Sequence, residues 1–354
     1  MSDPATYDIR TAIQRIVAGE LLSEADAAEA MNAIMDGVVT GAQIGAFVTA
    51  LRMRGETVEE IAGFARAMRA HATKLPLDAA DGTFVDTCGT GGDSAGTFNI
   101  STTASFVIAG AGVKVAKHGN RAVTSKSGSA DVLEALGVAI ELSPEGVARC
   151  VREAGIGFMF APSFHPAMRY VGPSRREIGI RTVFNILGPL TNPAGAKHQL
   201  VGVGHPDIAD KLASALAMLG SDHAVLVHAE IGLDELGLSG ASRVTEYDRR
   251  SDTIRRYLVT PEELGLAHAG LEALRGGDAA HNAGITRSIL SGELGPRRDV
   301  ILLNAGAGLY AANAAESFAD GIDIAARAID SGAALAALDQ LVFVSQSAAA
   351  GVGA

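Results

Sequence analysis

The chain has 354 residues, 48% of them hydrophobic and 19% charged, which suits two domains or one large one and excludes a disordered or fibrous protein. The formal net charge is −11, and an acidic surface repels nucleic-acid phosphates, so we expect no bulk binding of DNA or RNA. Two cysteines cannot build a disulfide framework, and no uncharged apolar stretch reaches the length of a membrane span, so we expect a cytoplasmic protein.

Residues 1–76 carry helix signals and no strand signals. Three short helices are expected, beginning after Ser23, Thr40 and Thr57. Gln43 and Glu60 each stand three residues after a threonine, which is the capping-box pattern, and Gly55 ends the second helix. We therefore expect a small all-helical N-terminal domain over residues 1–76.

Beyond residue 76, short apolar strands alternate with helices. The expected strands are 84–86, 113–116, 156–161, 200–203 and 224–228, and the expected helices are Ile100–Gly110, 129–136, Pro144–Ala154 and 208–219. This alternation indicates an α/β fold with a mostly parallel central sheet. An arginine-rich segment near 168–194 breaks it, and we expect that segment to return to the helical domain. The larger α/β domain would then comprise 77–167 and 195–354.

A glycine-rich loop at 86–93 follows the first of these strands, and a helix begins shortly afterwards at Asn99. Glycines let backbone N–H groups approach an anion, and a helix N-terminus adds positive potential. Ser94 stands where a dinucleotide-binding fingerprint needs glycine, and no Gly-Lys-Ser/Thr follows as in a P-loop. The loop is thus either a phosphate loop of another kind or a tight structural turn.

A second polar run, residues 117–131, also lies between a strand and a helix. It contains three basic side chains, four hydroxyl groups and two glycines, which can surround a phosphate with donors from several directions. Ligands of parallel sheets bind outside the carboxyl ends of the strands. Two such loops favour a phosphate site over an ordinary surface loop, with one loop for a diphosphate and the other for a monophosphate.

Asp234 and Glu235 follow the strand at 224–228. Adjacent carboxylates repel each other unless solvent or a cation lies between them, and Mg²⁺ prefers a few carboxylates together with phosphate oxygens and water. By itself the pair fits a solvated acidic turn as well. Beside two anion-binding loops, a Mg²⁺–diphosphate site is the more economical interpretation. The sequence has no Cys/His spacing typical of zinc.

Five segments resemble the anthranilate phosphoribosyltransferase family. They are residues 86–93, 99–102, 117–121, 128–137 and 181–193, in one order along most of the chain. The resemblance implies a nucleoside-phosphorylase-like fold and a homodimer. It also implies transfer of a phosphoribosyl group from 5-phosphoribosyl 1-diphosphate to the amine of anthranilate, in tryptophan biosynthesis, with Mg²⁺ as cofactor and two ions expected.

The resemblance further implies roles for individual residues. The donor would be bound by Gly89, Gly92, Asp93, Thr97, Asn99, Ile100, Ser101, Thr102, Lys117, His118, Gly119, Asn120, Arg121, Ala122, Val123, Thr124, Ser125 and Ser129. Anthranilate would contact Gly89, Asn120 and Arg175. The metal would be held by Ser101, Asp234 and Glu235. The transition state would be positioned by Lys117, His118 and Arg175.

Several alternatives stay open at this point. His118 could act as a base, but packing within its loop is the favoured interpretation, and His165 could line the entry of the acceptor. Arg175 suits a planar carboxylate, although a surface arginine is the alternative. A pyrimidine nucleoside phosphorylase would share the architecture, and so would a non-catalytic relative that binds nucleic acid.

Overall fold

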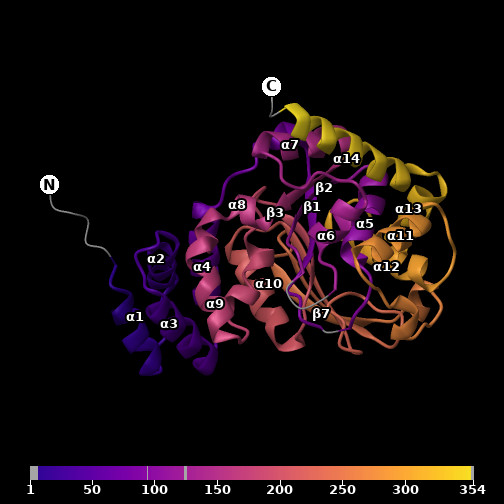
Figure 1. Ribbon diagram of the computed structural model, residues 1–354. Coiled ribbons are helices and arrows are strands. Elements are labelled where there is room, and N and C mark those ends of the chain that lie inside the picture. The colour runs from indigo at the N-terminus through magenta and orange to yellow at the C-terminus, as the bar shows by residue number, and fades with distance from the viewer. Residues whose placement is uncertain (1–6, 94, 123–125, 352–354) are drawn as a thin grey trace.

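The computed structural model describes residues 7–93, 95–122 and 126–351. Figure 1 shows a small group of helices beside a larger body built around one sheet. The expected fold class is confirmed: a helical N-terminal part is followed by an α/β part whose sheet is mostly parallel.

The N-terminal part contains four helices: α1 (Ile9–Val17), α2 (Glu24–Met35), α3 (Gly41–Arg54) and α4 (Val58–His71). Both expected capping boxes are present, with the hydroxyls of Thr40 and Thr57 accepting hydrogen bonds from the N–H groups three residues on. Gly55 caps the end of α3 at φ +87°, as expected. Helix α1, which the sequence did not single out, is capped by the Asp8 carboxylate.

The sheet has seven strands in the order β3-β2-β1-β4-β5-β6-β7. The strands are β1 (Phe84–Gly89), β2 (Lys114–Gly119), β3 (Ile156–Phe160), β4 (His198–Gly202), β5 (His223–Ala229), β6 (Ser242–Asp248) and β7 (Thr253–Val259). The first five in chain order are parallel and correspond to the expected strands, whereas β6 and β7 are antiparallel additions at one edge. The carboxyl ends of the parallel strands therefore meet at one edge of the sheet.

The expected helices of the α/β part are confirmed as α5 (Ile100–Gly110), α6 (Ser129–Ala135), α7 (Pro144–Ala154) and α10 (Ala209–Met218). Further helices that were not expected from the sequence are α11 (Ala279–Leu290), α12 (Pro296–Ala311), α13 (Phe318–Asp330) and α14 (Ala333–Ala350). By length and composition, α14 could cross a membrane. It carries Asp339, packs one face against α5, α7 and α13, and is 28% buried.

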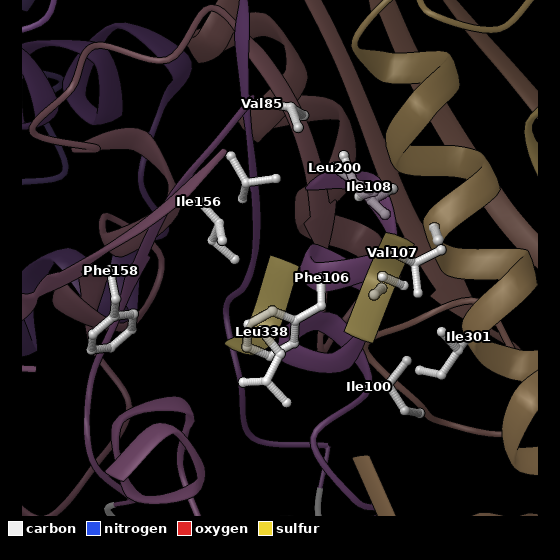
Figure 2. Packing of buried hydrophobic residues seen from close by; sticks show 14 of the residues in the cluster. Val85, Ile100, Phe106, Val107, Ile108, Ile156, Phe158, Leu200, Ile301 and Leu338 are labelled. Atoms are coloured by element: carbon white, nitrogen blue, oxygen red, sulfur yellow. The ribbon is translucent and has the colours of Figure 1, made fainter. Parts of the chain in front are cut away.

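Phe106 of α5 lies in the larger of the two hydrophobic cores (Figure 2). Phe106 is fully buried, and the cluster around it includes Val85 and Leu200 of the sheet, Ile301 of α12 and Leu338 of α14. Helix α5 thus lies between the sheet and the C-terminal helices. Because its first turn follows the glycine loop, this packing fixes where that turn meets a ligand.

A second core joins the N-terminal helices to the sheet. Buried residues of α1 to α4 form one cluster with α10 and with Val201 and Leu226 on β4 and β5. The segment 168–194 contacts this helical part through α9 (Gly172–Ile178), which packs against α3, and through a short turn at Pro166–Tyr170, which packs against α2. Because the core is shared, a domain division at residue 76 stays a proposal.

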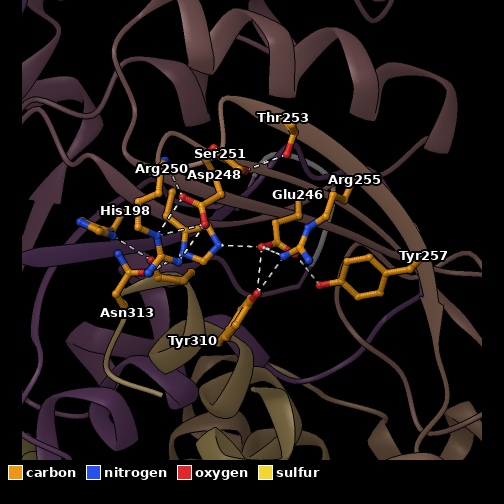
Figure 3. Close-up of polar contacts among 12 residues, drawn as sticks. His198, Glu246, Asp248, Arg250, Ser251, Thr253, Arg255, Tyr257, Tyr310 and Asn313 are labelled. Atoms are coloured by element: carbon orange, nitrogen blue, oxygen red, sulfur yellow. Dashed lines mark hydrogen bonds and ion pairs between the residues drawn. The ribbon is translucent and has the colours of Figure 1, made fainter. Parts of the chain in front are cut away.

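A buried acid anchors the antiparallel edge of the sheet (Figure 3). Four side-chain groups surround the carboxylate of Glu246: His223 Nε2 at 3.1 Å, Arg255 Nη2 at 2.8 Å, Tyr257 Oη at 2.8 Å and Tyr310 Oη at 2.9 Å. Burial by itself would raise the pKa of Glu246, but these partners outweigh it and lower the pKa to about 2. The network joins β5, β6 and β7 to α12.

We expect Glu246→Gln to lower the free energy of unfolding near neutral pH by about 3 kcal/mol, because it removes the one charge that satisfies these partners. The folded-state pKa lies below the ordinary value of 4.5, so the stability that Glu246 contributes is complete above that pH and is lost as the pH falls towards 2. Urea denaturation across that range should show the gap between wild type and variant closing.

Glu272→Gln is the matched control, since Glu272 is an exposed glutamate whose ion pair with Arg275 also lies at the surface. It should change the free energy of unfolding by less than about 0.5 kcal/mol. Equal effects of the two substitutions would contradict the anchoring role of Glu246.

Candidate active site

The glycine loop begins at Thr90, because β1 continues to Gly89 instead of ending at Asp86. Thr90 N–H donates to the Gly202 carbonyl at 2.9 Å, and the Thr90 hydroxyl accepts from Gly204 N–H at 2.9 Å. These bonds fasten the loop to the end of the neighbouring strand β4. The loop therefore lies at the carboxyl edge of the sheet, as expected for a ligand-binding loop.

Two glycines at this loop lie against charged side chains. Gly92 has φ +86°, which favours glycine, and a Cβ there would meet the Arg181 guanidinium. At Gly89, the last residue of β1, a Cβ would lie 2.9 Å from Asp234 Oδ2. A larger residue at either position would therefore displace a charged group of the candidate site.

The two carboxylates that follow β5 are hydrogen-bonded to both neighbouring segments. Asp234 Oδ2 accepts from Gly91 N–H at 2.9 Å, and Glu235 Oε1 accepts from Ser101 N–H at 3.1 Å. A third acid, Asp93, accepts a long 3.4 Å bond from the backbone N–H of Asp234. The glycine loop, the first turn of α5 and the turn after β5 therefore meet at these acids.

Both carboxylates keep partial access to solvent, yet their environment disfavours negative charge. Burial, reinforced by the charges of Glu235 and Asp93, raises the pKa of Asp234 well above its usual range. Burial also raises the pKa of Glu235 to about 7, against the opposing pull of the Lys117 ammonium. A divalent cation would relieve this repulsion.

The donor set suits Mg²⁺ better than zinc. Within the described parts of the chain, no three His, Cys, Asp or Glu side chains form a ready-made metal cage. Two carboxylates beside a phosphate loop instead match an ion that takes its other ligands from substrate oxygens and water. Asp234 and Glu235 fit the cofactor implied by the sequence.

The prediction that Lys117, His118 and Gly119 belong to a loop is wrong, because β2 runs through Gly119. Lys117 is 3% exposed, and its ammonium donates to the Thr87 carbonyl and, at 3.3 Å, to the Thr87 hydroxyl. Burial lowers its pKa, while Asp86 and Glu235 oppose that effect. The Lys117 side chain is therefore held beneath the site by its hydrogen bonds to Thr87.

The imidazole rings of His118 and His165 are in contact, with their centroids 4.9 Å apart and their planes inclined at 55°. Burial lowers the pKa of His118 to about 3 and that of His165 to about 4, so both rings are neutral at neutral pH. Neither Nε2 atom has a hydrogen-bond partner among the described residues. This geometry favours packing over a basic role for His118.

The loop after β2 is organised by its own acids. The Asp131 carboxylate accepts from Ala122 N–H at 2.9 Å, and Arg121 pairs with Asp131 and Glu134. Ser129 Oγ donates to the Asn120 carbonyl at 3.2 Å. The Arg121 guanidinium is therefore directed towards two acids of α6. Val123, Thr124 and Ser125 lie outside the described residues.

The residues before and within the first turn of α5 differ in what they can offer. Ile100 and Thr102 are each 2% exposed, so only their backbone could touch a substrate. Thr97 is paired with Arg275 in an isolated bridge. Asn99 precedes the helix without capping it, and Ser101 is half-buried. Few described side chains of this turn are therefore exposed enough to contact a ligand beside Glu235.

Arg175 is held on α9, with its guanidinium 5.8 Å from the centre of the Phe184 ring. Burial lowers its pKa, and no carboxylate pairs with it in the regions that the structure describes. Arg181 contacts the glycine loop, with its Nη2 3.5 Å from the Thr90 carbonyl.

Arg181 was therefore missed as a site residue. The sequence signal was available, because Arg181 opens the 181–193 motif. Two surface hollows, one between α11 and α12 and the other beside Ser221 and Tyr247, contain none of the candidate residues. The chemistry belongs to the loops at the sheet edge.

Two family descriptions match the chain. Residues 10–72 match the glycosyl transferase family, helical bundle domain, and residues 81–335 match the glycosyl transferase family, a/b domain. Anthranilate phosphoribosyltransferase of Chloroflexus aurantiacus is 59% identical over 340 residues, covering 96% of this chain and 99% of the relative. That of a Roseiflexus species is 60% identical over 339 residues, covering 96% and 98%.

Solved structures agree with this similarity. Anthranilate phosphoribosyltransferase from Thermus thermophilus has a TM-score of 0.89 at 46% identity, covering 95% of this chain and 99% of its own. The Saccharomyces cerevisiae enzyme in complex with PRPP and Mg has a TM-score of 0.87 at 29% identity, covering 96% and 98%. The chain thus belongs to the anthranilate phosphoribosyltransferases, pentosyltransferases of the glycosyl transferase family.

Proposed function

We propose that this chain transfers the 5-phosphoribosyl group from 5-phosphoribosyl 1-diphosphate to the amine of anthranilate, with Mg²⁺, as a step of tryptophan biosynthesis. The observation that carries the proposal is the meeting of a glycine loop, the first turn of α5 and two carboxylates of raised pKa at one sheet edge. Such a set suits a metal-bound diphosphate. The yeast relative in complex with PRPP and Mg adds support.

In this proposal, Gly89 to Asp93 and the first turn of α5 bind the diphosphate through backbone N–H groups. Asp234 and Glu235 would hold the metal, with Ser101, whose hydroxyl already bonds Glu235. Mg²⁺ supplies positive charge that neutralises the leaving diphosphate. The number of ions, for which two is the expectation, belongs to the same proposal.

The bond between the ribose anomeric carbon and the diphosphate oxygen breaks ahead of bond formation to nitrogen. The amine of anthranilate is already a nucleophile, so the neutral His118 need not take its proton in the transition state. Catalysis then comes from holding both substrates in line and from fixed charge, including that of the buried Lys117. The end of β2 and the loop that follows it, residues 117–125, would hold the other phosphate together with Ser129.

For the acceptor we propose Arg175, Asn120 and Gly89. The support is a partly buried guanidinium that no carboxylate neutralises in the described structure. A planar guanidinium binds a carboxylate through two parallel hydrogen bonds, which suits anthranilate. A yeast relative in complex with 4-fluoroanthranilate, with a TM-score of 0.85 at 28% identity, shows that a related enzyme binds such a ring.

A cytoplasmic homodimer completes the proposal. Val17, Leu21 and Met53 on or beside α1 and α3 are 72%, 59% and 84% exposed. Large apolar side chains that gather at one surface favour contact with another protein surface.

A direct test mixes the protein with anthranilate, 5-phosphoribosyl 1-diphosphate and Mg²⁺ and follows the fluorescence of anthranilate, which should decay. A second mixture contains thymidine and inorganic phosphate without Mg²⁺. Release of thymine there, with stable anthranilate fluorescence in the first mixture, would replace the proposal with a pyrimidine nucleoside phosphorylase. A salt-dependent shift of DNA in a gel would instead favour the nucleic-acid-binding relative.

We expect Arg175→Ala to raise the KM for anthranilate roughly 10- to 100-fold, the equivalent of losing a charged hydrogen bond worth about 1.5–3 kcal/mol. The KM for the donor should stay within about twofold of wild type. Steady-state kinetics with each substrate varied in turn measures both. Arg176→Ala, an exposed neighbour on the same helix, is the control. An unchanged KM for anthranilate would remove Arg175 from the acceptor site.

We expect Asp234→Asn combined with Glu235→Gln to reduce Mg²⁺-dependent turnover by on the order of 10²- to 10³-fold. The folded protein should be at least as stable as wild type, because neutral amides avoid the repulsion that raises both pKa values. Turnover against Mg²⁺ concentration and thermal unfolding test the two claims. Glu230→Gln, on the same connection, is the control. Wild-type metal dependence in the double variant would move the metal site elsewhere.

A further inference from the structure

We propose that Asn282 of α11 is a positioning residue for the donor site. Its amide fixes the side chain of Asn99, which lies between the glycine loop and α5, and Asn99 in turn binds the second loop, the part of the polar run 117–131 that follows β2. The inference rests on the proposed function, since it concerns the site where the donor would bind. It assigns a role in substrate binding to a helix that lies outside both loops.

The hydrogen bonds leave one orientation for both amides. Gly277 N–H donates to Asn282 Oδ1 at 2.8 Å, so Asn282 must present its Nδ2 to Asn99, whose Oδ1 accepts at 2.9 Å. Asn99 must then turn its own Nδ2 towards the Ser127 carbonyl, 3.1 Å away. One backbone N–H at residue 277 thereby sets the direction of a chain that ends in the second loop.

This use of Asn99 keeps its side chain away from its own helix. An asparagine that precedes a helix usually accepts a hydrogen bond from an N–H group of the first turn. Asn99 makes no such cap, because its Oδ1 accepts from Asn282 and, at 3.3 Å, from the Ser127 hydroxyl. The first-turn N–H groups of α5 therefore have other acceptors, and that of Ser101 donates to Glu235 Oε1 at 3.1 Å.

The segment that carries Asn282 also holds the backbone in front of Asn99. Phe98 N–H donates to the Leu274 carbonyl at 3.1 Å, and Gly276 N–H donates to the Gly96 carbonyl at 2.9 Å. A Cβ at Gly276 would lie 2.6 Å from Phe98 N, so the two backbones are in direct contact. Residues 274–282 thus position Asn99 through its main chain and its side chain together.

Helix α11 is well placed to hold this bond rigidly. It packs against α6, which follows the second loop, and the hydroxyl of Thr286 lies 2.8 Å from that of Thr103 on α5, which follows the glycine loop. Figure 1 shows α11 beside α5 and α6. Asn282 is 1% exposed, so water cannot replace its hydrogen bonds, and a lost partner leaves a buried polar group unsatisfied.

Asn282→Asp tests the proposal with almost no change of volume. The aspartate can still accept from Gly277 N–H, but its second oxygen then faces Asn99 Oδ1. If Asn99 turned its amide to meet that oxygen, its own Oδ1 would face the Ser127 carbonyl, so no orientation satisfies both contacts. Isothermal titration calorimetry of 5-phosphoribosyl 1-diphosphate with Mg²⁺, without acceptor, should show donor binding weakened by about tenfold.

Thr286→Val is the matched control, because it removes a buried hydrogen bond one turn further along α11 without touching Asn99. Its donor affinity should remain within about twofold of wild type. In steady-state kinetics, Asn282→Asp should raise the KM for the donor and leave the KM for anthranilate unchanged. An equal loss of donor affinity in Thr286→Val would show that general docking of α11 matters, and would overturn the proposal.

A double variant gives the decisive comparison. In an Asn99→Ala background, Asn282→Asp should weaken donor binding by less than about twofold further, because its effect passes through Asn99. Additive effects, or wild-type donor affinity of Asn282→Asp, would overturn the inference. If Asn282→Asp does not fold, Asn282→Ser takes its place under the same criteria. Failure of the wild-type protein to bind the donor would instead overturn the proposed function.

Discussion

Asp234 and Glu235 leave the sheet after β5, and each is hydrogen-bonded to the backbone of a different segment, Gly91 in the glycine loop and Ser101 in α5. The rest of the candidate site depends on these two bonds. They hold two acids where burial raises the pKa of each, with added repulsion from Asp93 on both and from Glu235 on Asp234. The two carboxylates accept hydrogen bonds from the N–H groups of Gly91 and Ser101, which would otherwise need a ligand or water as acceptor. A cation at this point would let both carboxylates ionise together.

Beneath the acids lies a second set of charges that does not reach solvent. Asp86 is fully buried and accepts from His118 N–H at 3.2 Å and from Asn192 Nδ2 at 2.8 Å. Lys117 lies within its field and that of Glu235. Burial raises the pKa of Asp86 and lowers that of Lys117, because it disfavours the charged form of each. Lys117 in turn opposes the rise in the pKa of Glu235, which moderates the cost of placing an acid there.

Much of the fold could be predicted from the sequence, because the signals were local. The capping boxes at Thr40 and Thr57 and the apolar strands of the parallel sheet needed no knowledge of distant residues. The strands β6 and β7 escaped prediction because their stability comes from pairing at the sheet edge and from the Glu246 network, where charged residues face each other. The C-terminal helices escaped because no motif drew attention to them.

For the candidate site, residue type could be predicted but orientation could not. The sequence indicated Lys117 as a loop cation and Arg121 as a phosphate ligand. The strand continues far enough to bury Lys117, and two acids of α6, Asp131 and Glu134, ten and thirteen positions along the chain, pair with Arg121. The burial of Lys117 and the partners of Arg121 both depend on the residue at which β2 ends, and element boundaries are hard to predict from a local sequence pattern. Arg181 was not predicted as a site residue because it is distant from Gly92 in the sequence and meets it only in the folded structure.

The two halves of the proposed reaction are carried by different parts of the chain. Donor residues lie on loops of the sheet, whereas Arg175 lies on α9, which packs against the N-terminal helices. These parts share a continuous core in which Phe47 and Phe64 belong to the same cluster as Leu226 of β5. A wide hinge opening would expose that core to water, at a cost proportional to the apolar area uncovered. Small movements of loops and of α9 are therefore the less costly way to bring acceptor and donor together. Such a movement would first change the contact between Arg181 and Thr90.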